Sequence, residues 1–278
     1  MDVAVGIVAQ RDNERAQDLA AALVDALEAA GASAVVDEAT GEAIAATAVP
    51  VGSMGDRDLV VSIGGDGTLL FVAREVGPTP IMGVNLGEVG FLNAVAPENA
   101  VDVVTDVVAD IARTGRVEGR ELARLRATGV DEDWTLAPAL NEIVVHGPRR
   151  GNGGGATVAV RVDGQSYAES HADGVLVATP TGSTAYNLSE GGPLVHPATD
   201  AVVVTQMAAA ESMPPLVVEP DSEITLSVSG SDTAYAISDG RNRQRLEPPA
   251  TVSVTLAADP VTLVGPRANF FDGLDKLE

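Results

Sequence analysis

Apolar and polar positions follow two different rhythms along the chain, and the change falls near residue 115. The chain opens with a short, almost continuous apolar run at residues 3–9, as expected for a strand that is buried on both faces of a parallel sheet. Leu19, Leu23 and Leu27 then recur at the spacing of one helix face, and Gly31 fits the position just after the helix end. A strand followed by a helix is the repeating unit of an α/β fold.

The same rhythm continues up to residue 115. Residues 58–63 and 80–84 are typical of two further strands, and residues 68–75 predict a short helix between them. Pro97 stands where another helix begins, and apolar side chains follow at helical spacing until Gly115 ends it. We therefore expect residues 1–115 to form an α/β nucleotide-binding domain with a parallel, Rossmann-like sheet.

Helical periodicity largely disappears after this point, and short β-rich runs take its place. Turn residues such as Asp163–Gly164 and Ser229–Gly230 separate the runs. Regularly spaced short strands of this kind predict an all-β, sandwich-like domain over residues 116–259. The runs are residues 157–162, 174–179, 202–205, 224–228, 233–237, 252–256 and 261–264. The last residues, 260–278, contain an apolar cluster and are expected to pack back on the first domain.

The charge balance is extreme. The 278 residues include 40 acidic and 17 basic side chains, for a net charge of −23, and Lys276 is the single lysine. Such an excess destabilises a compact fold by self-repulsion unless salt screens it, and the Debye length falls to about 3 Å at 1 M salt. We therefore predict a halophilic host with a salt-loaded cytoplasm; the alternative is a merely acidic protein of a mesophile.

The same composition narrows the partners. A surface this acidic argues against nucleic acid, because phosphate binding needs basic patches. No apolar run reaches the ~18 residues of a membrane span, and the N-terminus lacks the basic region of a signal peptide, so we expect a cytoplasmic protein with no membrane partner. The absence of cysteine excludes disulfides and thiolate metal sites.

The sharpest local feature is the sequence Ile63-Gly-Gly-Asp-Gly-Thr68, which follows an apolar strand and opens a helix. Glycines let the backbone approach a phosphate closely, and the amides at a helix start attract anions. Asp66 does not suit a phosphate anchor, because like charges repel, but it suits a general base or a Mg²⁺ ligand. The alternative is a tight turn in which Asp66 caps the helix.

Two further segments carry polar groups at strand ends. Residues 173–186 gather four hydroxyl side chains and a tyrosine around one proline and one glycine, which suits a polar, uncharged ligand such as a nucleoside. The alternative is a Ser/Thr-rich turn. Asn141–Glu142 precedes an apolar run. Carboxylates commonly hold ribose hydroxyls and asparagine can read an adenine edge, yet the dipeptide alone fits a solvated strand end far better.

In this order the segments resemble the NAD kinase family. The resemblance covers essentially the whole chain and includes the glycine loop, residues 83–92, Asn141–Glu142, and residues 173–189 with Gly191-Gly192-Pro193. The stretch from Thr179 to Tyr186 is its most specific part. The glycine loop alone is less specific, because lipid kinases and phosphofructokinases carry similar ones.

The resemblance implies a kinase that phosphorylates the 2′-hydroxyl of the adenosine ribose of NAD to give NADP, with ATP or another phosphoryl donor and Mg²⁺ held mainly by the donor phosphates. It implies Asp66 as the catalytic carboxylate and Gly65, Gly67 and Thr68 at the NAD or phosphate-donor site. It also implies a homo-oligomer, a dimer or tetramer, with NAD bound between the domains and across a subunit contact. The residues implied to line the NAD pocket are Asn141, Glu142, His171, Asp173, Thr181, Thr184, Ala185, Tyr186 and Ser189.

The chain departs from the family pattern in two places. The family usually carries a Pro-His-Ser-Leu-type segment with a nearby arginine, whereas residues 207–215 hold neither histidine nor arginine. The late Asp-Gly-Gln of the family is Asp239-Gly240-Arg241 here, and Arg241, Arg243 and Arg245 either face a phosphate or are solvated surface residues. The alternatives are a divergent kinase of another nucleoside or a lipid on the same scaffold, and a non-catalytic NAD(H)-binding regulator.

Overall fold

The chain divides into two compact units, each with its own core. The computed structural model describes residues 2–87, 91–149, 151, 154–267 and 269–274. The first unit consists of Met1–Leu122 and Asp259–Glu278, and the second of Ala123–Ala258. The chain therefore leaves the first unit and returns to it at the end.

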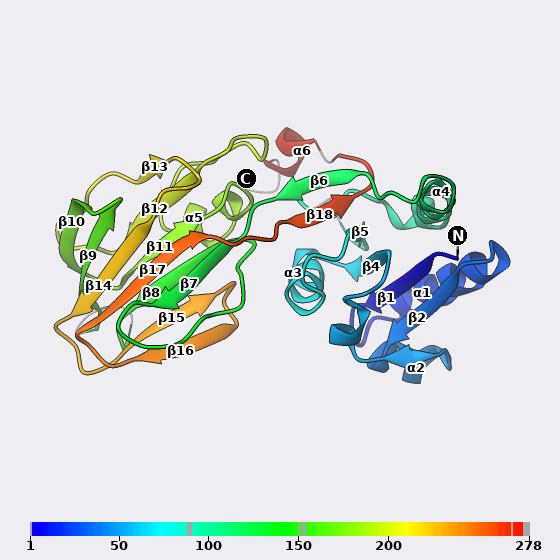
Figure 1. Ribbon diagram of the computed structural model, residues 1–278, viewed down its shortest axis with the longest axis horizontal. Helices are drawn as coiled ribbons and strands as arrows, with labels where there is room; N and C mark the ends of the chain where they lie inside the picture. Colours follow the sequence, from blue (N-terminus) through cyan, green and yellow to red (C-terminus); the bar gives the residue numbers. More distant parts are fainter. Residues whose placement is uncertain (1, 88–90, 150, 152–153, 268, 275–278) are drawn as a thin grey trace. The chain divides into compact units, whose positions relative to one another are not determined.

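The first unit is built on a seven-stranded sheet in the order β3-β2-β1-β4-β5-β18-β6, in which β6 alone runs antiparallel to its neighbour (Figure 1). The central strands are parallel and largely buried, as their continuous apolar runs predict. The order reverses between β1 and β4, which is the switch point of a doubly wound sheet. The strands are β1 (Ala4–Ala9), β2 (Ser33–Asp37), β3 (Ala48–Val49), β4 (Leu59–Gly64), β5 (Ile81–Asn85), β6 (Gly119–Leu122) and β18 (Val261–Val264).

Helices α1 and α4 pack on this sheet because each presents an apolar stripe to it. Leu23 and Leu27 of α1 and Val104 and Val108 of α4 are buried in one core cluster with the strands. No helix among the described residues is long and apolar enough to cross a membrane. The helical elements are α1 (Glu14–Ala29), α2 (Glu38–Ile44), α3 (Asp66–Glu75), α4 (Ala100–Thr114), α6 (Phe270–Leu274) and the 3₁₀ turns η1 (Val51–Met54) and η2 (Pro97–Asn99).

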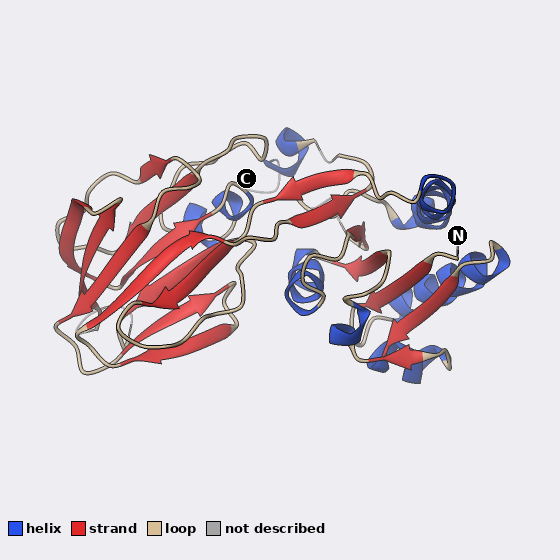
Figure 2. Cartoon of the chain, viewed as in Figure 1, coloured by secondary structure: helices blue, strands red, loops and turns tan. Residues whose placement is uncertain are grey.

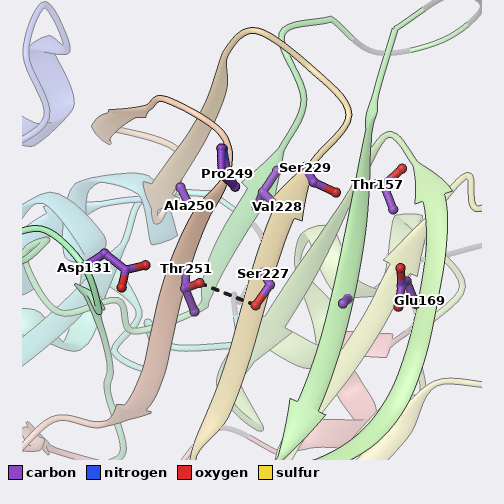
Figure 3. A pocket seen from close by; sticks show the side chains of 10 residues that line it. Asp131, Thr157, Glu169, Ser227, Val228, Ser229, Pro249, Ala250 and Thr251 are labelled. Carbon is purple, nitrogen blue, oxygen red and sulfur yellow. Dashed lines mark hydrogen bonds between the residues drawn. The ribbon is translucent and has the colours of Figure 1, made fainter.

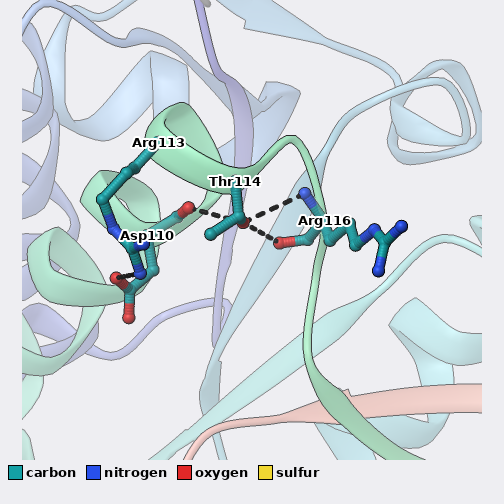
Figure 4. A network of polar contacts seen from close by, with 4 residues as sticks. All are labelled: Asp110, Arg113, Thr114 and Arg116. Carbon is teal, nitrogen blue, oxygen red and sulfur yellow. Dashed lines mark hydrogen bonds and ion pairs between the residues drawn. The ribbon is translucent and has the colours of Figure 1, made fainter.

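The end of α4 shows how the sequence stops a helix. Gly115 adopts the left-handed conformation with φ of 67°, which favours glycine, and its N–H donates to the carbonyl of Ile111. The Thr114 hydroxyl donates to the carbonyl of Asp110 at 2.7 Å and accepts the Arg116 N–H at 3.2 Å, and Arg113 pairs with the Asp110 carboxylate at 2.9 Å (Figure 4). The predicted helix end at Gly115 is confirmed.

The returning segment completes the first sheet. Strand β18 pairs in parallel with β5 and antiparallel with β6, and residues 116–122, which the sequence predicts in the second domain, belong to the first unit. The polar sequence Gly-Arg-Glu-Leu of β6 has no apolar alternation, so the sequence pattern places the boundary before this strand. Farther on, the ring of Phe270 lies 5.8 Å from that of Phe91, centroid to centroid.

The second unit is a sandwich of two antiparallel sheets, in the orders β10-β9-β14-β17-β7 and β13-β12-β11-β8-β15-β16 (Figures 1 and 2). Alternate side chains from both sheets form one core cluster, as the period-two pattern predicts. Strand β11 is buried along its whole length, because Val195 and Tyr186 cover its second face.

The strands of the five-stranded sheet are β7 (Leu125–Gly129), β9 (Ala156–Val162), β10 (Gln165–Ala172), β14 (Ile224–Ser229) and β17 (Ala250–Leu256). The strands of the six-stranded sheet are β8 (Glu142–His146), β11 (Gly174–Ala178), β12 (Val202–Met207), β13 (Leu216–Val218), β15 (Ala234–Ser238) and β16 (Asn242–Leu246). The short helical segments η3 (Thr181–Thr184) and α5 (Tyr186–Ser189) pack on this sheet.

Candidate catalytic loop and nucleotide-binding segments

The glycine loop lies at the carboxyl end of β4, beside the switch point of the first sheet. Strand β4 ends at Gly64, Gly65 is the N-cap residue, and Asp66 is the first residue of α3. The N–H of Gln10, just past the end of β1, donates to the carbonyl of Ile63 at 2.8 Å. Ligands of open α/β sheets bind at the carboxyl ends of the strands around such a switch point, and a helix start favours anions.

Gly65 and Gly67 leave the backbone of this loop open. A Cβ atom at either position would meet nothing within 4 Å, and neither residue needs the left-handed conformation. Glycine is therefore not required there by the packing of the chain itself. The bare backbone instead allows a phosphate to approach the first turn of α3 closely. At Gly64, by contrast, a side chain would collide with Thr68.

Asp66 is held by a residue that the sequence analysis missed. The Asn93 side-chain amide donates to Oδ1 of Asp66 at 3.2 Å and to the carbonyl of Gly64 at 3.4 Å. Asn93 is 1 % exposed, and Gly83 leaves the space that its side chain occupies. Asn93 directly follows the segment 83–92 that carried the resemblance; residues 88–90 of that segment lie outside the described residues.

In the second unit, Asn141 and Glu142 stand at the start of β8. Asn141 is half-buried, whereas Glu142 is only 6 % exposed and its Oε2 makes no hydrogen bond within the described part of the chain. Burial, together with the nearby Asp239 carboxylate, raises the pKa of Glu142 to about 7, although a hydrogen bond from the Tyr186 backbone acts in the opposite direction. A buried carboxyl with an unused oxygen is suited to receive donors from a ligand.

The hydroxyl-rich segment that follows β11 divides into two kinds of residue. Thr179 and Ser183 are fully buried and bond to backbone groups: Thr179 Oγ1 donates to the Leu140 carbonyl at 2.6 Å, and Ser183 Oγ accepts the Val195 N–H at 3.0 Å. Asn187 is likewise buried and accepts the hydroxyl of Thr205 at 2.8 Å. Among the side chains that stay partly or fully exposed are those of Thr181, Thr184, Ala185, Tyr186 and Ser189.

His171 and Asp173 lie away from the Asn141–Glu142 end: His171 is on β10 of the other sheet, and Asp173 directly precedes β11. Ala178 pairs with Glu142, but Gly174 pairs with His146, so the five residues of β11 separate Asp173 from the Asn141–Glu142 end by ~17 Å. The Asp173 carboxylate accepts the Gly151 N–H at 2.9 Å, and His171 Nε2 is 2.9 Å from the carbonyl oxygen of Gly154. Within one chain, these two residues are not brought next to Asn141 and Glu142.

The arginines of β16 are not all available to a phosphate. The guanidinium carbon of Arg243 lies 3.4 Å from the ring centroid of Tyr235, so this cation stacks on the aromatic face of the tyrosine. Arg243 and Arg245 point to the exposed side of the strand.

A hollow of about 340 Å³ on the outer face of the β10-β9-β14-β17-β7 sheet has a different character (Figure 3). It is lined by hydroxyl side chains such as Ser227 and Thr251, whose oxygens are 3.5 Å apart, together with the carboxylates of Asp131 and Glu169. No basic residue lines it, so it does not suit a phosphate-bearing ligand. None of the residues that the sequence analysis singled out as site residues lies there.

The chain matches two family domains. Residues 5–112 match the ATP-NAD kinase N-terminal domain, and residues 140–265 match the ATP-NAD kinase C-terminal domain. NAD kinase of Haloarcula marismortui is 55% identical over 98% of this chain and 99% of its own length, and NAD kinase of Halobacterium salinarum is 53% identical over 99% of each.

Solved structures show the same fold at lower identity. Yeast NADH kinase complexed with NADH superposes with a TM-score of 0.85 at 23% identity, covering 99% of this chain and 87% of that one. An NAD kinase from Archaeoglobus fulgidus in complex with ATP superposes with a TM-score of 0.76 at 24% identity, covering 99% and 98%.

Proposed function

Since the chain belongs to the NAD kinase family and phosphorylates NAD to NADP, we propose that Asp66 is the carboxylate that activates the attacking hydroxyl. One observation carries this assignment: Asp66 stands in the first turn of α3 between two glycines with open backbone, and Asn93 fixes one of its oxygens. A carboxylate held at a phosphate-binding helix start is suited to accept a proton from a hydroxyl that attacks a phosphoryl group.

The reaction assigns the groups of this loop different tasks. The 2′-hydroxyl oxygen of the adenosine ribose forms a bond to the γ-phosphorus of the donor, the bond from that phosphorus to the bridging oxygen breaks, and Asp66 takes the hydroxyl proton. Gly65, Gly67 and Thr68 bring backbone amides and a hydroxyl to the phosphates, and the positive end of α3 stabilises their charge.

We assign the adenosine part of NAD to the second unit. The unused Oε2 of Glu142 and the half-buried amide of Asn141 supply hydrogen-bonding groups for the ribose and the adenine. The exposed members of the following segment, Thr181, Thr184, Ala185, Tyr186 and Ser189, complete this surface, whereas Thr179 and Ser183 shape the backbone beneath it.

We assign ATP as the donor and Mg²⁺ as the cation. The family description and the ATP complex of the Archaeoglobus fulgidus enzyme support ATP. We propose that the donor phosphates provide most of the Mg²⁺ ligands, as phosphates commonly do in kinases. Bound there, Mg²⁺ would neutralise charge on the phosphates.

We also propose a cytoplasmic homo-oligomer, a dimer or tetramer, in which His171 and Asp173, near the junction of β10 and β11, reach the NAD site of a partner subunit. The separation of these two residues from Asn141–Glu142 within one chain supports this assignment. Light scattering at high KCl should give a mass of at least two chains, and a monomer that still turns over would contradict it.

The direct test of the catalytic assignment uses the full chain at high KCl with NAD, ATP and Mg²⁺, scored for NADP. Asp66→Ala should lose turnover by a factor of ~10² or more while NAD still binds. Asp56→Ala is the matched control, because Asp56 is an exposed carboxylate of the same unit, with 85% side-chain exposure. Turnover near the wild-type level in Asp66→Ala would refute the assignment.

A further inference from the structure

The carboxylate of Asp239 collects three consecutive backbone amides from a distant part of the chain. Oδ2 accepts the Leu140 N–H at 2.7 Å, and Oδ1 accepts the N–H groups of Asn141 at 2.8 Å and Glu142 at 3.1 Å. The N–H of Asp239 in turn donates to the carbonyl of Glu142 at 3.1 Å. These partners are 97 to 99 residues away in sequence.

Thr179 holds the same segment from its other side. Its N–H donates to the carbonyl of Asn141 at 2.9 Å, and its hydroxyl donates to that of Leu140 at 2.6 Å. Gly182 passes so close to the Asn141 backbone that a side chain there would collide with it. The backbone of residues 140–142 is thus fixed on both sides, and the side chains of Asn141 and Glu142 are the parts left to meet a ligand.

The side chain of Asp239 accepts backbone hydrogen bonds at the point where the neighbouring strand ends. Strand β15 pairs with β8 only as far as Ser238 opposite Ile143. Beyond that point the amides of residues 140–142 have no strand beside them on the β15 side, and the Asp239 carboxylate accepts them instead. The Asp239 carboxylate therefore holds the backbone of the residues that the proposed function assigns to NAD.

The turn itself does not require a carboxylate. Asp239 and Gly240 have φ of 45° and 67°, a left-handed pair that joins β15 to β16. Asn-Gly forms such turns at least as well as Asp-Gly. What asparagine lacks is the second acceptor oxygen: its amide N–H₂ would face a backbone N–H that now donates to the carboxylate. The three backbone amides are therefore what requires a carboxylate, with two acceptor oxygens, at this position.

We infer that Asp239 is a positioning residue for NAD binding: it sets the backbone of residues 140–142 so that the side chains of Asn141 and Glu142 are aligned for the nucleotide. This inference rests on the proposed function of those two side chains. It is supported by the electrostatics, because the Asp239 charge contributes to the raised pKa of the Glu142 carboxyl. The other influences on that carboxyl are its burial and the Tyr186 backbone hydrogen bond.

The test compares two aspartates in matching turns. Asp163 has φ of 48°, is followed by Gly164 in the turn between β9 and β10, and accepts a remote backbone amide, that of Glu223, at 2.9 Å. Asp163→Asn therefore removes the same charge from the same kind of turn, while its amide oxygen can still accept the one Glu223 N–H. KM for NAD, kcat and thermal unfolding are measured for both variants and the wild type in the same KCl.

Asp239→Asn should raise KM for NAD roughly tenfold and leave kcat within about threefold, since charge-assisted hydrogen bonds orient the binding segment but not the catalytic loop. The pH at which KM changes should move downwards, because loss of the Asp239 charge lowers the pKa of Glu142. Asp163→Asn should change neither. Unfolding curves are recorded to verify that each variant is folded at the assay temperature.

Asn141→Ala distinguishes the positioning role of Asp239 from the assignment of Asn141 and Glu142 to NAD binding. If Asn141→Ala raises KM for NAD and Asp239→Asn leaves both KM and the pH midpoint at wild-type values, the positioning role is overturned while the proposed function stands. An equal loss in Asp163→Asn would also overturn it, because any weakened turn would then suffice. If Asn141→Ala and Glu142→Gln both leave KM unchanged, the assignment of these residues to NAD fails, and the role of Asp239 fails with it.

Discussion

The side-chain amide of Asn93 donates to Oδ1 of Asp66 across 3.2 Å, from a position 27 residues farther along the chain. The same amide reaches the carbonyl of Gly64 at 3.4 Å, so one buried side chain ties the end of β4 to the first turn of α3. The orientation of the carboxylate is therefore set by packing around Asn93 and not by the glycine loop alone.

Removing this support should impair chemistry more than binding. Asn93→Ala is expected to lower kcat by ~10- to 100-fold, because small misplacements of a catalytic group have effects of that size, with little change in the Kd for NAD. Asn13→Ala is the control: it removes the amide side chain that caps α1 in the same unit, where Oδ1 accepts the Ala16 N–H at 3.4 Å. An unchanged kcat in Asn93→Ala would show that Asp66 does not depend on this contact.

Glu142→Gln should stabilise the fold while weakening NAD binding. The folded-state pKa of Glu142 is raised from 4.5 to about 7, so below the lower value both states are protonated and the group has no effect. As the pH rises through this window the unfolded chain ionises first, and the wild type loses up to ~3 kcal/mol of stability that is not regained above it.

The neutral variant avoids this loss. Its free energy of unfolding should exceed that of the wild type above about pH 7, and the difference should shrink towards about pH 4.5. Denaturant unfolding at several pH values in constant KCl measures it. A variant that is less stable than the wild type at high pH would contradict the assignment of Glu142 as a desolvated carboxyl.

Thr179 gives a prediction about the floor of the NAD surface. Thr179→Val keeps the shape but leaves the Leu140 carbonyl and the Gly182 N–H without the hydroxyl that now bonds to both, at 2.6 and 3.0 Å. We expect a loss of about 2 kcal/mol in unfolding free energy and a raised KM for NAD. Thr179→Ser retains the hydroxyl and should keep KM near the wild-type value. Equal KM values in both variants would show that the hydrogen bonds of this hydroxyl do not affect NAD binding.

The charge balance predicts strong salt dependence. With 40 acidic and 17 basic residues, self-repulsion weakens as the Debye length shortens from about 10 Å at 0.1 M salt to about 3 Å at 1 M. Tm should therefore rise steadily with KCl into the molar range. The relatives from Haloarcula and Halobacterium support this expectation. Equal Tm at low and multimolar KCl would contradict it.

The sequence predicted those elements whose side chains have a clear burial pattern. The buried strands β1, β4 and β11 and the amphipathic α1 and α4 were recognised because apolar side chains recur at the period of each element. Strands β10 and β16 were missed because they consist mainly of polar residues that face solvent at sheet edges. Tertiary pairing, and not local preference, makes them strands.

The candidate site shows the same division. Asp66 and the surrounding glycines could be read from a short segment, because a strand, a turn and a helix start follow one another there. The contacts from Asn93 to Asp66 and from Asp239 to residues 140–142 join positions far apart in sequence, so no local pattern reveals them. Thr179 and Ser183 looked like ligand groups, but burial assigns their hydroxyls to the backbone.

The central claim is a division of labour between Asp66 for chemistry and Asn141–Glu142 for holding NAD. Its most direct test measures kcat together with the Kd for NAD in Asp66→Asn and in Glu142→Gln, in the same KCl. Asp66→Asn should lower kcat by ~10² to 10⁴ with Kd within about threefold, and Glu142→Gln should weaken NAD binding about tenfold with kcat largely retained. Loss of NAD affinity in Asp66→Asn with near-normal kcat, or loss of kcat alone in Glu142→Gln, would contradict the account.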